Sequence, residues 1–355
     1  MASPPTLVDP PLPQSPSAQS GRTRKRGGGI ILFFVFVLVL AGAGAVGAYW
    51  HYFRYEPVAA RHVPVGSSLA VRVDFQEIAL FAPVRRHIWP VFFEQRAANS
   101  ADSETTLANR IEKATGLKLG RDIREIIFVN HGRTDSGKWL VILGGKIPRG
   151  MVGALAELAE KEKASWELTP SKDALVFRSL GFALGQASDR TLIFASDLAT
   201  LSLALPSQDG ARAMGLPETG ALGFAISASA WNEWGSGVAA TFVPGVRSLA
   251  QLQGCNGRFL LGSEPQLEMQ CRLAQGVDAE KIRSSLLGIT TTVQGLSLLV
   301  GGSDTMGERR ALADLKIENL GDGRLRMVAP WPMDGLDRGA EMLATKLRGI
   351  RLIAN

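Results

Sequence analysis

Apolar and polar positions alternate in two short segments that lie far apart in the chain. Residues 69–73 place Leu and Val at every second position and end at an aspartate, and residues 222–226 do the same with Leu, Phe and Ile and end at a serine. A period of two is typical of a strand with one face turned to a core. A segment with helical tendency follows each strand, at residues 77–95 and 229–253. The pattern predicts the same strand–helix unit twice.

Each unit then continues into a predicted hairpin, an amphipathic helix and further short strands. The expected hairpin arms are 126–130 with 139–143, and 258–261 with 267–273. The expected helices are 104–115, 151–163, 278–287 and a closing helix at 336–352, together with a short one that begins at Asp197 as its N-cap. The further strands are expected at 174–178, 182–186, 191–195, 311–317 and 325–329.

The fold class predicted from these elements is α+β, with two similar halves that follow one N-terminal transmembrane helix. Each half is expected to form a mainly antiparallel sheet with helices on one face. The predicted boundaries are a disordered basic cytoplasmic tail at 1–29, the transmembrane helix at 30–50, a juxtamembrane linker at 51–62, the first half at 63–205, a seam at 206–216, and the second half with its C-terminal helix at 217–355.

The transmembrane prediction rests on an uncharged run from Ile30 to Trp50. Its 21 residues would span about 31 Å as a helix, which matches the hydrocarbon thickness of a bilayer. Four basic residues lie just before the run and aromatic residues gather just after it. The positive-inside rule then predicts a single-pass protein of the inner (cytoplasmic) membrane, with its N-terminus in the cytoplasm and its main domain outside. The lipid bilayer would be one partner, through this helix.

Two alternatives to the membrane helix start from its small residues. Residues 43–45 have the small-residue pattern of a signal-peptide cleavage site, so the run could be cleaved rather than retained. Residues 42–47 also fit the dinucleotide motif G-x-G-x-x-G. That motif needs a short strand before it and an amphipathic helix after it, and neither pattern is present.

The charge of the chain is concentrated at its N-terminus. The formal net charge is +6, and half of it comes from residues 1–29. The rest is too dilute for a nucleic-acid surface, on which Lys and Arg cluster along one face. We therefore expect no nucleic-acid partner.

Three short motifs carry a resemblance to a known family. They are a small-residue strand entry at 64–68, the segment TGLKLGRDI at 115–123 ahead of an apolar strand, and a strand that ends in two glycines at 143–145. With the repeated pattern, the chain resembles a family of single-span bacterial envelope proteins with a duplicated extracytoplasmic α+β module. The family has no assigned activity, so the resemblance implies an architecture and no site residues.

No motif predicts catalytic, cofactor-binding or metal-binding residues. Residues 132–138 fit the P-loop pattern G-x-x-x-x-G-K, but Trp139 follows where Ser or Thr should bind Mg²⁺, and the chain continues as a strand. A P-loop must open a helix, so a polar hairpin loop is the better interpretation. The four histidines show no ligand spacing, and no serine motif of a hydrolase occurs.

Two residue pairs remain as candidates. Trp231 and Trp234 could contact a partner through exposed rings, or they could be core residues on a helix face. Cys255 and Cys271 lie on opposite arms of the second hairpin. A four-residue loop would leave them three positions out of register, whereas a bulge or another loop length would place them opposite each other for a disulfide. Both a disulfide and two buried thiols are compatible with the sequence.

The function predicted from these observations is a membrane-anchored extracytoplasmic binding or assembly protein without catalytic activity. Its partner would be an envelope protein, a lipid or a cell-wall component. The alternative is an envelope hydrolase or transferase whose site is assembled from scattered residues. A pocket with converging polar groups would distinguish the two.

Overall fold

A computed structural model describes residues 57–91, 107–134, 137–161, 167–168, 174–177, 181–237, 245–299 and 306–353. The chain divides into two units, Met1–Tyr55 and Glu56–Asn355, and the description below concerns the second. The predicted tail at 1–29, the predicted span at 30–50 and its two alternatives lie outside the described residues.

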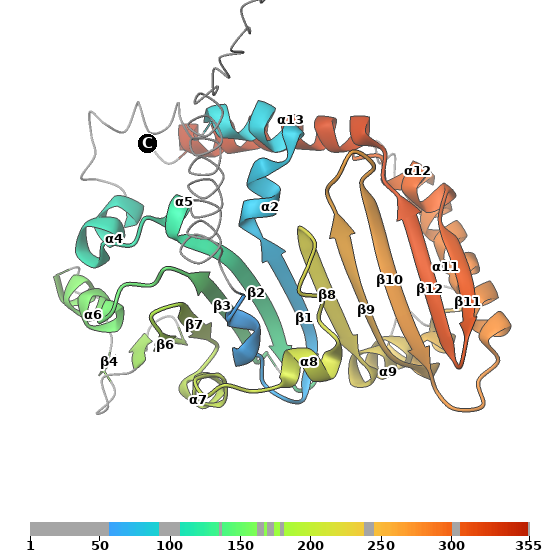
Figure 1. The fold of residues 1–355 in the computed structure, drawn as a ribbon, viewed down its shortest axis with the longest axis horizontal. Coiled ribbons are helices and arrows are strands. Elements are labelled where there is room, and N and C mark those ends of the chain that lie inside the picture. The colour runs from blue at the N-terminus through green and yellow to red at the C-terminus, as the bar shows by residue number, and fades with distance from the viewer. Residues whose placement is uncertain are drawn as a thin grey trace, which may run out of the picture. The chain divides into compact units, whose positions relative to one another are not determined.

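The second unit is built on one antiparallel sheet of 12 strands in the order β11-β12-β10-β9-β8-β1-β2-β3-β7-β6-β5-β4 (Figure 1). The strands are β1 Ser67–Asp74, β2 Ile123–His131, β3 Trp139–Gly145, β4 Glu167–Leu168, β5 Ala174–Phe177, β6 Phe182–Ser188, β7 Thr191–Ala195, β8 Leu222–Ser227, β9 Leu252–Leu260, β10 Gln266–Leu273, β11 Lys316–Gly321 and β12 Arg324–Pro330.

This single sheet corrects the predicted fold class. Two separate sheets were expected, one in each half, but β1 pairs with β8 and joins them. The physical reason is that the first strand of each half would otherwise be a bare edge, and antiparallel pairing gives its N–H and C=O groups partners.

The predicted single-pass topology and inner-membrane location are corrected as well. None of the helices in the described part of the chain is both long enough and apolar enough to cross a bilayer. Residues 30–50, where the span was expected, lie outside that part.

The strand order repeats on the two sides of the β1–β8 pair. Outward from β1 it is β1-β2-β3-β7-β6, and outward from β8 it is β8-β9-β10-β12-β11. Val71 pairs with Phe224 at the middle of the junction. An approximate two-fold axis normal to the sheet at this pair would relate the two orders.

The helices are η2 Ala59–His62, α2 Phe75–Leu80, η3 Val84–Ile88, α4 Leu107–Thr115, α5 Leu119–Asp122, α6 Met151–Lys161, α7 Leu198–Ala204, α8 Gly210–Met214, α9 Ala228–Ser236, η4 Val246–Gln251, α11 Ala279–Leu299, α12 Glu308–Ala313 and α13 Met333–Ile353. They cover the sheet unevenly. Paired residues of neighbouring strands share a face, so we call the face that carries Ala70 face A and the face that carries Val71 face B.

Face A is buried in the first half and at the neighbouring strand β8. There η2, α7 and α8 cover it, and Val63, Leu201 and Ala211 pack with sheet residues such as Ile127 and Ile142. In Figure 1, α8 lies in front of the strands and α11 lies behind them. Because α6 packs on face B of the same half, helices cover both of its faces, which differs from the expectation of helices on one face.

Face B is buried at its two outer ends. In the first half α6 packs on it, with Met151 and Val152 against Leu184. In the second half α9, η4 and α11 pack on it, with Ile282 against Leu325 and Met327. The four middle strands, β8, β1, β2 and β3, lie between these two clusters.

The predicted seam at 206–216 contains α8. Its glycine Gly210 lies so close to η2 that an added Cβ would come 2.3 Å from the carbonyl oxygen of Val63. Gly215 ends the helix with a φ of 72°, a conformation that glycine adopts readily.

Candidate binding surface

The structure contains a disulfide between Cys255 and Cys271, whose Cα atoms are 4.1 Å apart. The two residues face each other across β9 and β10, and Leu260 faces Gln266. The connecting loop therefore has five residues and not four, and this length places the cysteines in register. Both side chains are buried in the cluster of the second half.

The two candidate tryptophans have different environments. Trp231 is 9% exposed and belongs to the buried cluster of the second half. Trp234 is 37% exposed, and its ring packs edge-on against Trp231 with centroids 5.2 Å apart. Only Trp234 is available for a contact at the surface.

An apolar surface of face B lies between the two buried ends of the sheet. The registers place one apolar row across it, running Phe224–Val71–Phe128–Val141 from β8 to β3. Exposure rises to 49% at Phe128, and Trp139 at the start of β3 is 41% exposed. We call this surface the central patch; its members are Leu69, Val71, Val73, Ile126, Phe128, Trp139, Val141, Leu222 and Phe224.

Two strands of the central patch, β2 and β3, are apolar on both faces over their middle residues. In β2, Ile127 and Val129 are buried on face A, while Ile126 and Phe128 point to face B. A strand that is half exposed usually alternates apolar with polar residues. Contiguous apolar surface that stays exposed marks an interaction site in many soluble proteins.

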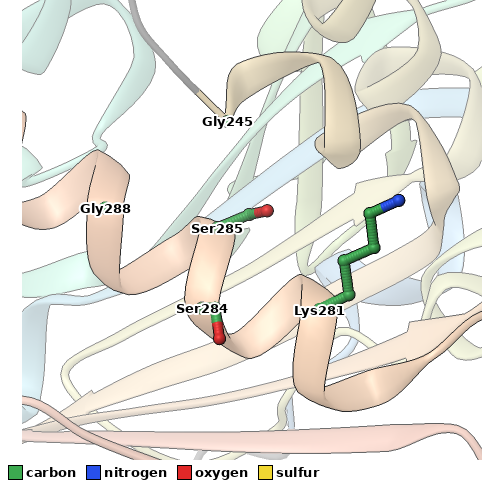
Figure 2. Close-up of a pocket in the computed structure, with 5 residues that line it drawn as sticks. All are labelled: Gly245, Lys281, Ser284, Ser285 and Gly288. Atoms are coloured by element: carbon green, nitrogen blue, oxygen red, sulfur yellow. The ribbon is translucent and has the colours of Figure 1, made fainter.

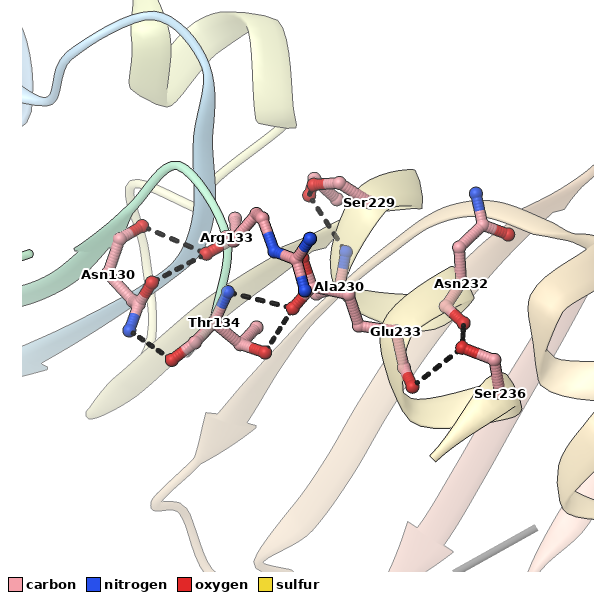
Figure 3. A network of polar contacts seen from close by, with 10 residues as sticks. Asn130, Arg133, Thr134, Ser229, Ala230, Asn232, Glu233 and Ser236 are labelled. Atoms are coloured by element: carbon pink, nitrogen blue, oxygen red, sulfur yellow. Dashed lines mark hydrogen bonds and ion pairs between the residues drawn. The ribbon is translucent and has the colours of Figure 1, made fainter. Parts of the chain in front are cut away.

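A polar network lies beside the central patch, where the β2–β3 loop meets α9 (Figure 3). The Thr134 backbone N–H and hydroxyl both donate to Glu233 Oε2, the former over 2.8 Å. Arg133 Nε lies 3.8 Å from Glu233 Oε1, and Asn130 Nδ2 donates to the Thr134 carbonyl over 3.3 Å. We call these four residues the loop network. They tie a hairpin of the first half to a helix of the second.

A second link between the two halves lies at the other end of the central strands β1 and β8, between α2 and the β9–β10 loop. Burial raises the pKa of Glu77 on α2 above its ordinary value, and the negative charge of Asp74 adds to this effect. Hydrogen bonds from backbone amides, including that of Leu261 in the β9–β10 loop, oppose the rise. Glu77 of the first half therefore lies near the hairpin loop of the second half, whereas Glu233 of the second half is hydrogen-bonded to the hairpin loop of the first.

A pocket of the described region lies elsewhere, as an open depression of about 490 Å³ on α11 (Figure 2). Gly245, Lys281, Ser284, Ser285 and Gly288 line it. In Figure 2 the Lys281 amine extends away from the Ser284 hydroxyl. Within the described region no hydrogen bond joins this amine to either serine, so the pocket lacks the activated nucleophile that a Ser–Lys site needs.

The histidines of the described region show no shared site. Burial lowers the pKa of His62, whose Nδ1 lies 3.0 Å from the Ala204 carbonyl oxygen between η2 and α7. Burial, together with the charge of Lys138, lowers the pKa of His131 at the end of β2. No group of three metal-ligating side chains occurs among the residues that the structure describes. The P-loop-like letters at 132–138 connect β2 to β3, as expected for a hairpin.

Phe128 and Trp139 were not among the residues predicted as partner contacts. The signal for them is the pair of unbroken apolar runs at 126–129 and 139–143, which are apolar at consecutive positions. Such runs predict strands buried on both faces. Which face stays open depends on where the helices pack, and the sequence pattern does not contain that information.

Comparison with protein-family models and with curated proteins found no match. Among solved structures, the chain has a weak structural resemblance to "Structure of crystal form III of TP0453", with a TM-score of 0.41 and 11% sequence identity over 82% of this chain and 99% of that one. A second structure, "Structure of crystal form I of TP0453", gives a TM-score of 0.38 at 11% identity, over 82% and 98%.

Proposed function

We propose that this chain is a binding or assembly protein without catalytic activity that holds a partner protein on the central patch. The observation that carries the proposal is the exposure of Phe128 and Trp139 on an apolar sheet face. Aromatic side chains dominate the cores of protein interfaces and contribute most of their binding free energy. Trp234, at the neighbouring helix α9, would extend the contact.

The polar surroundings favour a protein over a lipid as the occupant. Arg133, Thr134 and Glu233 lie beside the patch and offer hydrogen-bond donors and acceptors. A polypeptide can pair with such groups at the rim while its apolar side chains cover the rings. An acyl chain has no polar groups that could form hydrogen bonds with these rim residues, so they would remain hydrated.

The alternative of an enzyme has less support. A hydrolase or transferase site needs a concave pocket with converging polar groups. The depression on α11 is open, and its serines and lysine are not hydrogen-bonded to one another within the described region.

Site-specific photo-crosslinking in living cells tests the proposal. The full chain would carry p-benzoylphenylalanine in place of Phe128, with Leu198 on α7 as the control position because it is similarly exposed on another surface. We expect one protein crosslinked from position 128, identified by mass spectrometry, and absent from position 198. Adding Trp139→Ala should reduce the crosslinked yield by about tenfold, since truncating an interface anchor costs roughly 1–2 kcal/mol or more.

Two outcomes would contradict this function. A lipid adduct from position 128 would assign the patch to another class of ligand, and no adduct at all would leave the patch without a partner. Circular dichroism on the Trp139→Ala variant distinguishes a lost contact from a lost fold.

A further inference from the structure

Face A of strands β9–β12 carries mainly polar side chains, which are exposed or half-exposed in the described part of the chain. In Figure 1, β9, β10 and β12 lie open towards the viewer, while α11 lies behind them. The apolar core of this half is on the opposite face. Side chains on face A are therefore not needed to fill that core.

This surface carries more basic than acidic side chains. The strand registers place five basic residues and two acidic ones, Glu268 and Glu318, on face A of β9–β12. We call it the basic face; its basic residues are Arg258, Arg272, Lys316, Arg324 and Arg326. Glu268 pairs with two arginines at once, Arg258 at 2.9 Å and Arg326 at 3.3 Å.

Two arginines of the basic face lie directly opposite each other. Arg272 of β10 pairs in register with Arg324 of β12, and both are exposed. Like charges in this position destabilise a sheet. Arg324 has only a distant contact, 3.7 Å from the exposed Asp322, and Arg272 forms no ion pair with a carboxylate in the described part of the chain. An anion placed between the two guanidinium groups would relieve this repulsion.

We propose that the basic face binds an acidic segment of a protein, and that Arg272 and Arg324 form ion pairs with its carboxylates. Guanidinium groups bind carboxylates through paired, charge-assisted hydrogen bonds. Glu268 and Glu318 favour a polypeptide over a phosphate surface, because a polypeptide can form ion pairs with them through its own basic residues. This surface lies on the face opposite to the central patch, so it can bind its segment whether or not that patch has a partner.

Fluorescence anisotropy with a labelled hexaglutamate peptide tests this proposal on the full chain. The Arg272→Ser/Arg324→Ser variant should bind the peptide about tenfold more weakly at low salt, since both guanidinium groups and their charge-assisted hydrogen bonds to carboxylates are lost. The matched control is Arg149→Ser/Arg190→Ser, which removes the same charge from exposed positions of the first half. It should change the affinity less than about twofold, because distant exposed charges are screened.

A charge-reversal variant tests whether the same two positions can be made to bind a peptide of opposite charge. The Arg272→Glu/Arg324→Glu variant should lose hexaglutamate and acquire affinity for hexalysine, while keeping the circular dichroism spectrum of the parent. Equal weakening in the variant and the control would show that only net charge matters and would overturn the proposal. So would undetectable binding of hexaglutamate to the parent, or binding of phosphatidylglycerol vesicles that is tighter than that of the peptide and depends on the same arginines.

Discussion

The ion pair between Arg72 and Glu125 offers a quantitative test of how the centre of the sheet is stabilised. Arg72 Nε donates to Glu125 Oε2 over 2.8 Å, and the side chains are 2% and 0% exposed. The pair also connects other elements, since Glu125 Oε1 accepts from the Ala59 backbone N–H and Arg72 Nη2 donates to Asp74 over 2.9 Å. It therefore links β1, β2 and η2 beneath the helices of face A.

Removing one partner should be much more costly than removing both. Arg72→Met leaves a buried carboxylate that still accepts a hydrogen bond from the Ala59 backbone N–H over 3.2 Å but has lost its guanidinium partner. We expect a loss of about 3–5 kcal/mol in the free energy of unfolding, the range for an uncompensated buried charge. Glu125→Leu should cost somewhat less, because Arg72 keeps the partly exposed Asp74. The double variant should be destabilised less than Arg72→Met alone, since a hydrophobic pair can replace a buried ion pair at little cost.

Urea denaturation of all four proteins, followed by tryptophan fluorescence and circular dichroism, measures this cycle. Arg258→Met is the matched control, because Arg258 lies on the same face with a glutamate partner but is 40% exposed. Its cost should stay below about 1 kcal/mol. Additive costs for Arg72→Met and Glu125→Leu, with no coupling within about 0.5 kcal/mol, would refute the reasoning.

Two further predictions concern stability. Replacing both Cys255 and Cys271 by Ala should lower the free energy of unfolding by about 3 kcal/mol, the chain-entropy value for a closed loop of this size; unchanged denaturation midpoints with and without reductant in the parent would contradict it. Asp197 caps α7 through Thr200, and Asp197→Ala should cost about 1 kcal/mol. Burial alone would raise the pKa of Asp197, but hydrogen bonds from Thr200 and Ser196 outweigh it and lower the pKa. Its stabilisation should therefore be complete above the unfolded pKa of about 4 and disappear as the pH falls through the lower folded pKa. Asp197→Asn, which keeps a cap without the charge, should lack this pH dependence in urea titrations.

Local elements of the fold were predictable because they depend on neighbouring residues. The alternation at 69–73 and 222–226 lies within β1 and β8, and the expected closing helix at 336–352 lies within α13. Asp197 was recognisable as a helix cap from its position before an apolar segment. Each of these signals lies within one continuous stretch of the chain and follows from backbone hydrogen bonding and side-chain period.

The join between the halves was not predictable in the same way. The pairing of β1 with β8 brings together segments that are separated by most of the first half, and no local pattern encodes it. The register of the cysteines had the same difficulty, since both the length and the position of the β9–β10 loop decide whether they meet. The basic face was also not predictable from the sequence, because its charged residues come from four strands and lie side by side only in the folded sheet.

The exposure of the central patch follows from where the connecting helices run. In both halves the long helix, α6 or α11, follows the third strand and leads to the outermost strands. Each is therefore drawn outwards over face B, as the buried clusters at the two ends of the sheet show. Only the short helices α2 and α9 follow the central strands β1 and β8, and these strands are antiparallel, so the two helices lie at opposite ends of the pair. Joining two such halves through their first strands thus leaves the middle of face B with the least cover. Its residues nevertheless stay apolar, and a sheet face that served only to meet water would carry polar side chains at these positions.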